Sequence, residues 1–585
     1  MARRLFPEIP RICFYANKVC PRCGVVACST LKAHKTHTRT IATLHIGTMA
    51  VYEVVMKCEM CNGVVRSEEL AQLVPKNGKF GFDVMVHIGT ALFLESKTES
   101  TIQADLAGKN VTISQREIGH LGRRFIMYLA LAHKDSSRAI RSLISKKGGY
   151  ILHLDGTCEG DSPHLMTSMD EISEIILNNV KIPSEKAAFI IPLLREIRAS
   201  YGDPLALVHD MGPGILDAIR FVFPSIPDFI CHYHFLRDIG KDLIEAKYTI
   251  LRKTLKSYGL KTGVRNFVKK LRVKIQRDAV LRENLAACMA SATTQEQNNR
   301  PPIIAAYLLG LWILDYTNEL HGFGFPFDRP HLAFFDRLKA AYGIVQAVGK
   351  TNYDTSPFAE LYKLLSGIVN DDNLNQHVED MRKKIAVFEE LREIMRIALP
   401  ENSDGLNDDG TDVDMVSMES RMTEFRKKMM AKLTASKTPD IVYKKMIRQM
   451  DKYWDKLFSK PITIQTPDGP ITIQPQRTNN ILERFFRGLK RLYRKKNGAT
   501  SLTKTLRYML ADTPLVINLK NPAYVQAILN GADSLESRFA QLEISRVRQM
   551  ALTSRDEIET TPKALKKLVR LPTFMFGLER LSVGT

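Results

Sequence analysis

The stretch YILHLDGT, residues 150–157, marks the start of a sheet-forming region. A short apolar run ends in Asp155, and strand and helix patterns then alternate for about eighty residues. This alternation predicts a mixed sheet with helices on its faces. The expected elements are strands at 150–155, 164–169 and 174–182, a helix at 184–202, a strand at 204–210, a helix at 212–224 and a strand at 228–234.

Two acids leave the carboxyl ends of apolar strands in this region. Asp155 ends the first strand, and Asp210 ends the run PLALVHD. Sites form at that edge of an α/β sheet, and an unpaired buried carboxylate costs several kcal/mol. Asp155 could instead belong to a DGT turn, and Asp210 could cap the helix that follows. Two such acids in one sheet, with a third available, favour a functional site.

The third acid lies in RTNNILERFFRGLKRLYRKKNG, residues 477–498. The run 484–496 holds seven Lys or Arg and no acid, and Glu483 stands directly before it. On a helical wheel, one face holds Glu483, Arg487, Lys490 and Arg494, and an adjacent apolar stripe holds Leu482, Phe486, Leu489 and Tyr493. Glu483 could pair with Arg487, which is worth a few tenths of a kcal/mol. It could instead bind metal while the cations follow a phosphate backbone.

The N-terminal region contains two CxxC pairs, formed by Cys20, Cys23, Cys58 and Cys61. Four thiolates at this spacing can close a tetrahedral Zn²⁺ site. Alternating residues between the pairs predict a hairpin, so we expect a zinc ribbon; four unmetallated structural cysteines are the alternative. CxxC pairs also favour a reducing compartment.

Residues 101–134 predict two helices joined near GKNVTIS, with Ser114 as the N-cap of the second. The pattern is typical of a helix-turn-helix, although two packed helices with a plain connector would look the same. In the DNA-binding interpretation, the side chains that enter the major groove are Gln115, Arg116, His120 and Arg123.

Composition points to a polyanionic partner. The chain has 84 Lys+Arg against 63 Asp+Glu, a net charge of +21, which favours nucleic acid first and an anionic membrane second. Met1–Pro10 lacks the apolar core of a signal peptide. The longest apolar run, 303–314, is too short to span a bilayer and predicts a buried helix.

Three motifs resemble those of the DDE transposases of the ribonuclease H-like superfamily. They are LHLDGT with Asp155, LALVHDMGPGI with Asp210 and TNNILERFFRGLKR with Glu483. CHYHFLRDIG, residues 231–240, resembles the Cys-x-x-His element of Mutator-like transposases and some insertion-sequence relatives. The zinc ribbon followed by a helix-turn-helix is similar to the front end of zinc-ribbon insertion-sequence transposases.

The resemblance implies a multidomain α+β fold, in which a large all-helical insertion interrupts a ribonuclease H-like α/β catalytic core. The expected domains are a zinc ribbon with associated strands (1–98), a helix-turn-helix (99–146), the first part of the core (147–240), the helical insertion (241–460), the second part of the core (461–512) and a basic helical tail (513–585).

The resemblance also implies a chemistry. Asp155 would bridge two Mg²⁺ or Mn²⁺ ions, and Asp210 and Glu483 would each hold one. Cys231 and His234 would neighbour the active site, where His234 could contact the scissile phosphate or orient Asp210. A structural zinc, or a buried cysteine beside a hydrogen-bonded histidine, remains an alternative for this pair. Structural Zn²⁺ is expected in the N-terminal ribbon.

The implied function is a transposase that binds terminal inverted repeats, cleaves the DNA ends and joins them to target DNA. Its expected partners are double-stranded DNA and a second copy of the chain, at least a homodimer on DNA, with no membrane. The expected location is the prokaryotic cytoplasm, in association with the nucleoid. The alternatives are a domesticated DNA-binding regulator that no longer cuts, and a ribonuclease H-like nuclease without strand transfer.

Overall fold

The computed structural model consists of two compact units. One comprises Met1–Phe229 with Pro461–Thr585, and the other comprises Ile230–Lys460. The chain therefore leaves the first unit and later returns to it. The structure describes residues 9–24, 31–290, 301–351, 354–399, 412–435, 440–498, 501–543, 545–549, 571 and 573–574.

The N-terminal sheet is built around a long hairpin. Its strands are β1 (Arg11–Tyr15), β2 (Leu31–Thr43), β3 (Gly47–Cys58) and β4 (Val64–Val65). β2 and β3 are antiparallel, β1 pairs with the other side of β3, and β4 adds to the end of β3. The predicted hairpin is confirmed and is longer than its alternating residues indicated.

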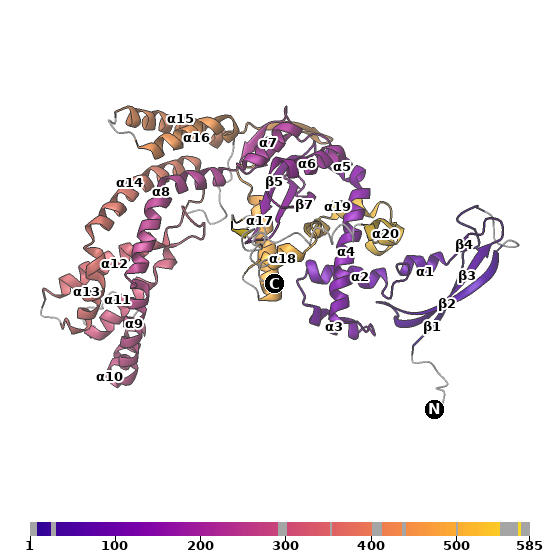
Figure 1. Cartoon of the computed structure of the whole chain (residues 1–585), viewed down its shortest axis with the longest axis horizontal. Helices are drawn as coiled ribbons and strands as arrows, with labels where there is room; N and C mark the ends of the chain where they lie inside the picture. Colours follow the sequence, from indigo (N-terminus) through magenta and orange to yellow (C-terminus); the bar gives the residue numbers. More distant parts are fainter. Residues whose placement is uncertain are drawn as a thin grey trace, which may run out of the picture. The chain divides into compact units, whose positions relative to one another are not determined.

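Helices follow this sheet along the chain (Figure 1). They are α1 (Glu68–Leu73), α2 (Phe82–Phe93), α3 (Glu99–Ala107), α4 (Gln115–Asp135) and α5 (Ser137–Lys146). The predicted N-cap is confirmed, because Ser114 Oγ accepts a hydrogen bond from the Glu117 amide at 3.2 Å. α4 extends over 21 residues and buries nearly all of its C-terminal half, so it is a core helix as well as the second helix of the predicted pair.

A five-stranded sheet with the order β7-β6-β5-β8-β9 forms the centre of the first unit. β5 is antiparallel to β6 and parallel to β8. The sheet therefore contains both kinds of strand pairing, which confirms the predicted mixed sheet. The predicted strand 228–234 is too long, because the strand ends at Ile230 and a helix begins at His232. The elements are β5 (Ile151–Thr157), β6 (His164–Asp170), β7 (Ile176–Ile182), α6 (Ala187–Tyr201), β8 (Ala206–His209), α7 (Pro213–Val222) and β9 (Asp228–Ile230).

The chain re-enters this unit through the predicted PDG hairpin. β10 (Ile462–Thr466) and β11 (Gly469–Ile473) are antiparallel, as expected for strands joined by this turn. α17 (Asn480–Asn497) and α18 (Thr503–Tyr508) come next.

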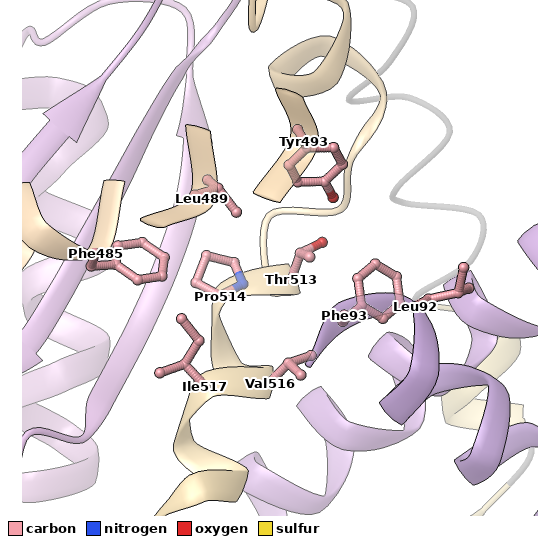
Figure 2. A pocket seen from close by; sticks show the side chains of 9 residues that line it. All are labelled: Leu92, Phe93, Phe485, Leu489, Tyr493, Thr513, Pro514, Val516 and Ile517. Atoms are coloured by element: carbon pink, nitrogen blue, oxygen red, sulfur yellow. The ribbon is translucent and has the colours of Figure 1, made fainter. Parts of the chain in front are cut away.

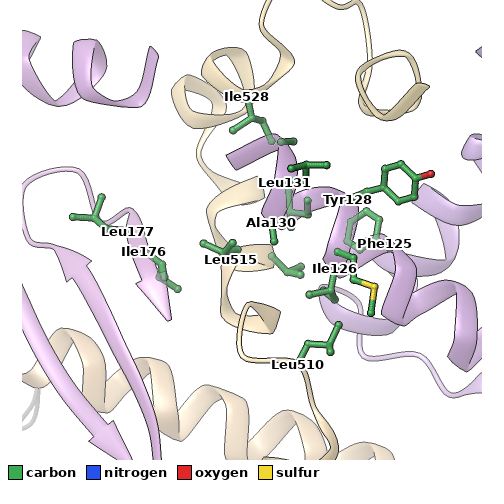
Figure 3. Packing of buried hydrophobic residues seen from close by; sticks show 14 of the residues in the cluster. Phe125, Ile126, Tyr128, Ala130, Leu131, Ile176, Leu177, Leu510, Leu515 and Ile528 are labelled. Carbon is green, nitrogen blue, oxygen red and sulfur yellow. The ribbon is translucent and has the colours of Figure 1, made fainter. Parts of the chain in front are cut away.

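One hydrophobic core joins α4, the sheet and the segment after α18 (Figure 3). That segment comprises η2 (Thr513–Lys520), α19 (Pro522–Leu529) and α20 (Leu535–Gln541). Tyr524 and Phe539 are fully buried in this core. The region predicted as a basic helical tail therefore begins as part of the core, and residues 551–570 fall outside the described ranges.

The second unit is built from helices. They are α8 (His232–Ser257), α9 (Leu260–Arg277), α10 (Ala279–Ala290), α11 (Pro302–Leu314), η1 (Tyr316–Glu319), α12 (Pro330–Val348), α13 (Ser356–Val369), α14 (Asp372–Met395), α15 (Asp412–Ala435) and α16 (Ile441–Leu457). The apolar run 303–314 forms α11, which buries Ile304, Ala306 and Ile313. Within the described ranges, no helix of either unit has both the length and the apolarity needed to cross a membrane.

Candidate functional site

Two neighbouring strands bring Asp155 and Asp210 to one edge of the sheet. β5 and β8 run parallel with Leu154 opposite His209, so the residue that follows each of these is an acid at the same level. Adjacent strands lie about 4.8 Å apart, so the two backbones are direct neighbours here. The side chain of Asp155 is buried and that of Asp210 is half-buried.

The structure excludes the two structural alternatives for these acids. Asp155 does not form a turn, because β5 continues through Thr157. Asp210 does not cap α7, because the N-cap of that helix is Gly212 and makes no side-chain capping bond.

Hydrogen bonds fix both acids relative to neighbouring residues. The Gly156 amide donates to Asp155 Oδ1 at 2.7 Å. The buried His209 ring donates from Nδ1 to the Asp210 carbonyl oxygen at 2.7 Å, and its Nε2 lies 3.1 Å from Asp228 Oδ2. The ring thus links the end of β8 to the start of β9.

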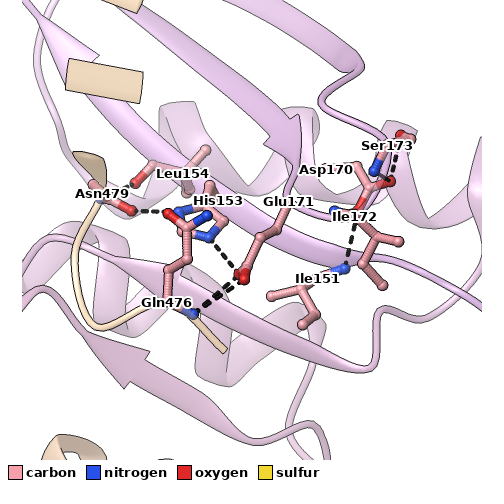
Figure 4. Close-up of polar contacts among 9 residues, drawn as sticks. All are labelled: Ile151, His153, Leu154, Asp170, Glu171, Ile172, Ser173, Gln476 and Asn479. Carbon is pink, nitrogen blue, oxygen red and sulfur yellow. Dashed lines mark hydrogen bonds and ion pairs between the residues drawn. The ribbon is translucent and has the colours of Figure 1, made fainter. Parts of the chain in front are cut away.

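The start of α17 is tethered to β5 beside Asp155 (Figure 4). Asn479 is the N-cap residue of α17 but makes no side-chain capping bond. Its amide group instead donates to the Leu154 carbonyl at 3.1 Å, and its amide oxygen accepts from His153 Nδ1 at 3.0 Å. Glu483 lies one turn further on, with its amide bonded to the Asn479 carbonyl at 2.9 Å. The third predicted acid therefore comes from a helix that is fastened to the strand carrying the first.

A second attachment lies just before this tether. His153 Nε2 is 2.8 Å from Glu171 Oε2, and the Gln476 amide also donates to the Glu171 carboxylate at 3.2 Å (Figure 4). His153 is fully buried, and Glu171 is nearly so. We did not identify these residues from the sequence; a histidine inside an apolar strand and two asparagines before a helix were the available signals.

The apolar side of α17 is wider than the predicted stripe. Leu482 and Leu489 are buried as expected, but Phe485 is also buried, whereas Phe486 is only partly covered. The reason is that α17 faces both the main core and a second cluster with Leu165 of β6 and Leu506 of α18. Its apolar side also lines a pocket with the end of α2 and with η2 (Figure 2); the lining residues are Leu92, Phe93, Phe485, Leu489, Tyr493, Thr513, Pro514, Val516 and Ile517. Burial raises the pKa of Tyr493 to about 12.

The cations predicted to share a face of α17 with Glu483 are exposed. Arg487, Lys490 and Arg494 all face solvent, and Lys490 Nζ lies 4.0 Å from Glu159 Oε2. The Glu159 carboxylate also accepts a hydrogen bond from the Leu502 amide at 3.0 Å. That bond holds the pKa of Glu159 below its usual value.

A further carboxylate lies at the same edge of the sheet. Glu185 Oε1 is 3.0 Å from His164 Nδ1. A Cβ atom added to Gly156 would lie 3.0 Å from Glu185 Oε1, and one added to Gly212 would lie 3.6 Å from Glu185 Oε2. The Glu185 carboxylate therefore sits beside the residue that follows Asp155 and close to the turn that follows Asp210. Nothing in the local sequence marked it, because it lies in the loop before α6.

The donor set at this edge fits a hard divalent cation. Carboxylate oxygens are the ligands that Mg²⁺ and Mn²⁺ prefer. The ligand oxygens of Asp155, Asp210 and Glu483 are not all within 4.8 Å of one another. A site for two ions 3.5–4 Å apart does not need every ligand oxygen to lie close to every other one, so the donor type is compatible with such a site.

Cys231 and His234 lie at the beginning of α8 in the second unit. Cys231 is the N-cap residue of α8, and His234 occupies its first turn. Both are buried, and the Cys231 Sγ and a ring nitrogen of His234 lie within 4.8 Å of one another. The short strand β9 followed by a helix, rather than one long strand, produces this spacing. Their role beside an active site stays a prediction.

The four N-terminal cysteines converge as predicted and could hold zinc. Their Sγ atoms all lie within 4.8 Å, with Cys20 3.5 Å from Cys61 and Cys23 3.6 Å from Cys58. Four thiolates around Zn²⁺ with Zn–S bonds of 2.3 Å would be about 3.8 Å apart. A backbone hydrogen bond from Arg22 lowers the pKa of Cys20 to about 6, which favours the thiolate.

The four residues predicted to enter a major groove lie on the first three turns of α4. Gln115, Arg116 and His120 are exposed, whereas Arg123 is half-buried and donates to the Tyr508 carbonyl at 3.4 Å. Gln115 also donates to Gln103 of α3 at 3.3 Å, which ties the two helices together. Contact of these residues with DNA stays a prediction.

Comparisons with known proteins give a distant structural likeness. No protein-family model and no curated protein matches the chain. Among solved structures, the chain is similar to the Drosophila P element transposase strand transfer complex, with 12% sequence identity and a TM-score of 0.34. The match covers 75% of this chain and 92% of that chain. A likeness at this level assigns no activity to the chain.

Proposed function

We propose that the chain is a DDE-type DNA transposase, which cleaves the ends of its element and joins them to target DNA. One observation carries this proposal. Three acids far apart in the sequence come from two adjacent parallel strands and from a helix tethered to one of those strands. Surface acids that only increase solubility do not require such an arrangement of strands and helix.

Asp155, Asp210 and Glu483 would hold Mg²⁺ or Mn²⁺. When bound, the ions would activate the attacking water or 3′-OH and neutralise the leaving oxygen. β5 pairs with β8 and is also bonded to the N-cap residue of α17, so the strand of Asp155 is attached to the elements that carry both other acids. This position fits the bridging role that we expect for it.

The other residues of the site would orient the acids and the DNA. His153 and Asn479 fix the end of β5 against α17, and therefore fix Asp155 relative to Glu483. Arg487, Lys490 and Arg494 would bind the phosphate backbone beside the acids. Cys231 and His234 would neighbour the reacting phosphate.

The N-terminal region would recognise the element ends. In this proposal, the zinc ribbon and the exposed start of α4 bind the inverted repeats, with Gln115, Arg116, His120 and Arg123 in the major groove. Two ends must be joined in one reaction, so we propose that the chain acts on DNA as a dimer or a larger assembly.

The test uses DNA that flanks the gene, with Mg²⁺ or Mn²⁺ present. We expect the wild-type chain to cut this DNA and to join pre-cut ends to a plasmid. Asp155→Asn, Asp210→Asn and Glu483→Gln should each bind DNA normally and fail to cut. Asp217→Asn, an exposed acid on α7, is the matched control and should cut normally.

Each alternative function gives a different outcome. Cutting without joining would indicate a nuclease, and binding without cutting by the wild-type chain would indicate a DNA-binding regulator. Cutting that survives all three substitutions would show that the acids are wrongly assigned.

A further inference from the structure

The second unit contains a run of positive charge longer than the one on α17. Residues 252–277 include ten Lys or Arg and no Asp or Glu. The run covers the end of α8 and the whole of α9, which follow one another in the chain and in space (Figure 1). All ten cations are exposed.

The apolar side of α9 is already occupied within its own unit. Leu260, Val264, Phe267, Val268, Leu271 and Ile275 are buried. They face a helix pair, because α9 packs against α11 and α13. A helix that inserts into a membrane surface needs a free apolar side, so α9 does not fit a lipid partner.

The cations form two stripes that flank the buried side. The first stripe holds Lys261, Arg265, Lys269 and Arg272, and the second holds Lys270, Lys274 and Arg277. The second stripe forms an ion pair, since Lys270 Nζ lies 2.6 Å from Glu360 Oε2. In the first stripe, the Lys261 ammonium donates to the Tyr316 hydroxyl at 2.7 Å. Among the residues that the structure describes, Arg265, Lys269 and Arg272 have no acid within ion-pair distance.

We infer that the first stripe of α9 is a binding surface for the phosphate backbone of double-stranded DNA, an inference that rests on the proposed function. Its residues are spaced by four, four and three positions, or about 4.5–6 Å along a helix that rises 1.5 Å per residue. Phosphates of one DNA strand are spaced by 3.4 Å along the axis, so the stripe offers one cation for every one or two phosphates. Such contacts position DNA and carry no direct sequence information.

The test is the salt dependence of DNA binding by the full-length chain. The variant replaces Arg265, Lys269 and Arg272 with Gln and leaves Lys261, which Tyr316 already holds. The control replaces Lys427, Lys444 and Arg448 with Gln; these three exposed cations of α15 and α16 lie on helices that also carry acids. Each variant keeps its buried residues, and circular dichroism checks that it folds.

We expect the slope of log K against log[salt] to fall by about 2.7 in the α9 variant, because each lost phosphate contact removes about 0.9. The control should keep the wild-type slope. Equal slopes in the two variants would overturn the inference. So would a loss of binding to phosphatidylserine vesicles without any loss of binding to a random-sequence DNA duplex.

Failure of this inference can be told apart from failure of the proposed function. Metal-dependent cutting is measured on the same wild-type preparation. Wild-type cutting with an unchanged slope in the α9 variant would remove only the DNA-binding role of α9. If the α9 variant has a reduced salt slope but the wild-type chain does not cut DNA, the transposase proposal is contradicted and the DNA-binding role of α9 is supported.

Discussion

α17 and α9 both carry acid-free runs of cations next to a buried apolar side, but they begin differently. α17 starts at Asn479, which is bonded to the strand that carries Asp155, and has Glu483 in its first turn. α9 starts at Gly259, a glycine in the left-handed conformation, and has no acid in its first turn. Both charge patterns predict attraction to phosphate, and in the proposed function only the helix attached beside Asp155 also takes part in the chemistry.

Replacing the acid at the head of α17 gives the largest expected effect. Glu483→Gln should lower the rate of metal-dependent DNA cutting at saturating DNA by at least about 10³-fold, because it removes a ligand of the catalytic ions. The α9 variant Arg265→Gln/Lys269→Gln/Arg272→Gln should cut at close to the wild-type rate under the same conditions. Single-turnover assays measure both rates. An equal loss of cutting rate in both variants would show that α17 and α9 do not differ in their contribution to catalysis.

Loosening the tether of α17 gives the next largest effect. Asn479→Ala removes two buried hydrogen bonds worth about 1–3 kcal/mol together, and we expect cutting to slow by about 10–100-fold. Asn518→Ala is the matched control, because Asn518 is equally buried and also makes two hydrogen bonds, both to Ile176. Both variants should have a lower melting temperature than the wild type. Only Asn479→Ala should show a lower cutting rate per folded molecule. Similar rate losses would show that Asn479 acts only on stability.

Neutralising cations on α17 should affect both binding and chemistry. Arg487→Gln/Arg494→Gln should reduce the salt slope by about 1.8 and should also slow cutting at saturating DNA. The α9 variant should reduce the slope alone. Filter binding and single-turnover cutting on one set of samples make this comparison. Identical profiles for the two helices would contradict their separate roles.

Removing a zinc ligand should have the smallest effect on the DNA-binding and catalytic roles of α9 and α17. Cys58→Ser should lower bound zinc from about one ion per chain to near zero, because a four-thiolate site loses one ligand. The contribution of the α9 stripe to the salt slope should stay the same. Atomic absorption measures the zinc content. Full zinc retention would show that the four cysteines do not hold the ion.

The sequence predicted those parts of the site that depend on neighbouring residues. The apolar strands that carry Asp155 and precede Asp210, the PDG hairpin and the Ser114 cap each follow from a local pattern of apolar and turn-forming residues. The run DFICHYH was wrong as one strand, because a short aromatic stretch fits a strand as well as the first turn of a helix.

The parts that escaped prediction depend on residues far apart in the chain. Asn479 meets Leu154 across 325 positions, and no local pattern encodes that hydrogen bond. Glu185 belongs to a loop, and only the fold brings it beside Gly156. Tyr524 and its neighbours lack a clear apolar period, so their place in the core was not visible in the sequence.

Iron-directed cleavage of the protein tests most directly whether Asp155, Asp210 and Glu483 share one metal site. Fe²⁺ replaces Mg²⁺, ascorbate and peroxide generate radicals at the bound ion, and mass spectrometry maps the cuts in the chain. We expect cuts at three separate segments, next to residues 155, 210 and 483, and their joint loss in Asp155→Asn. Cuts beside only one of these acids, or an unchanged pattern in Asp155→Asn, would contradict a shared site.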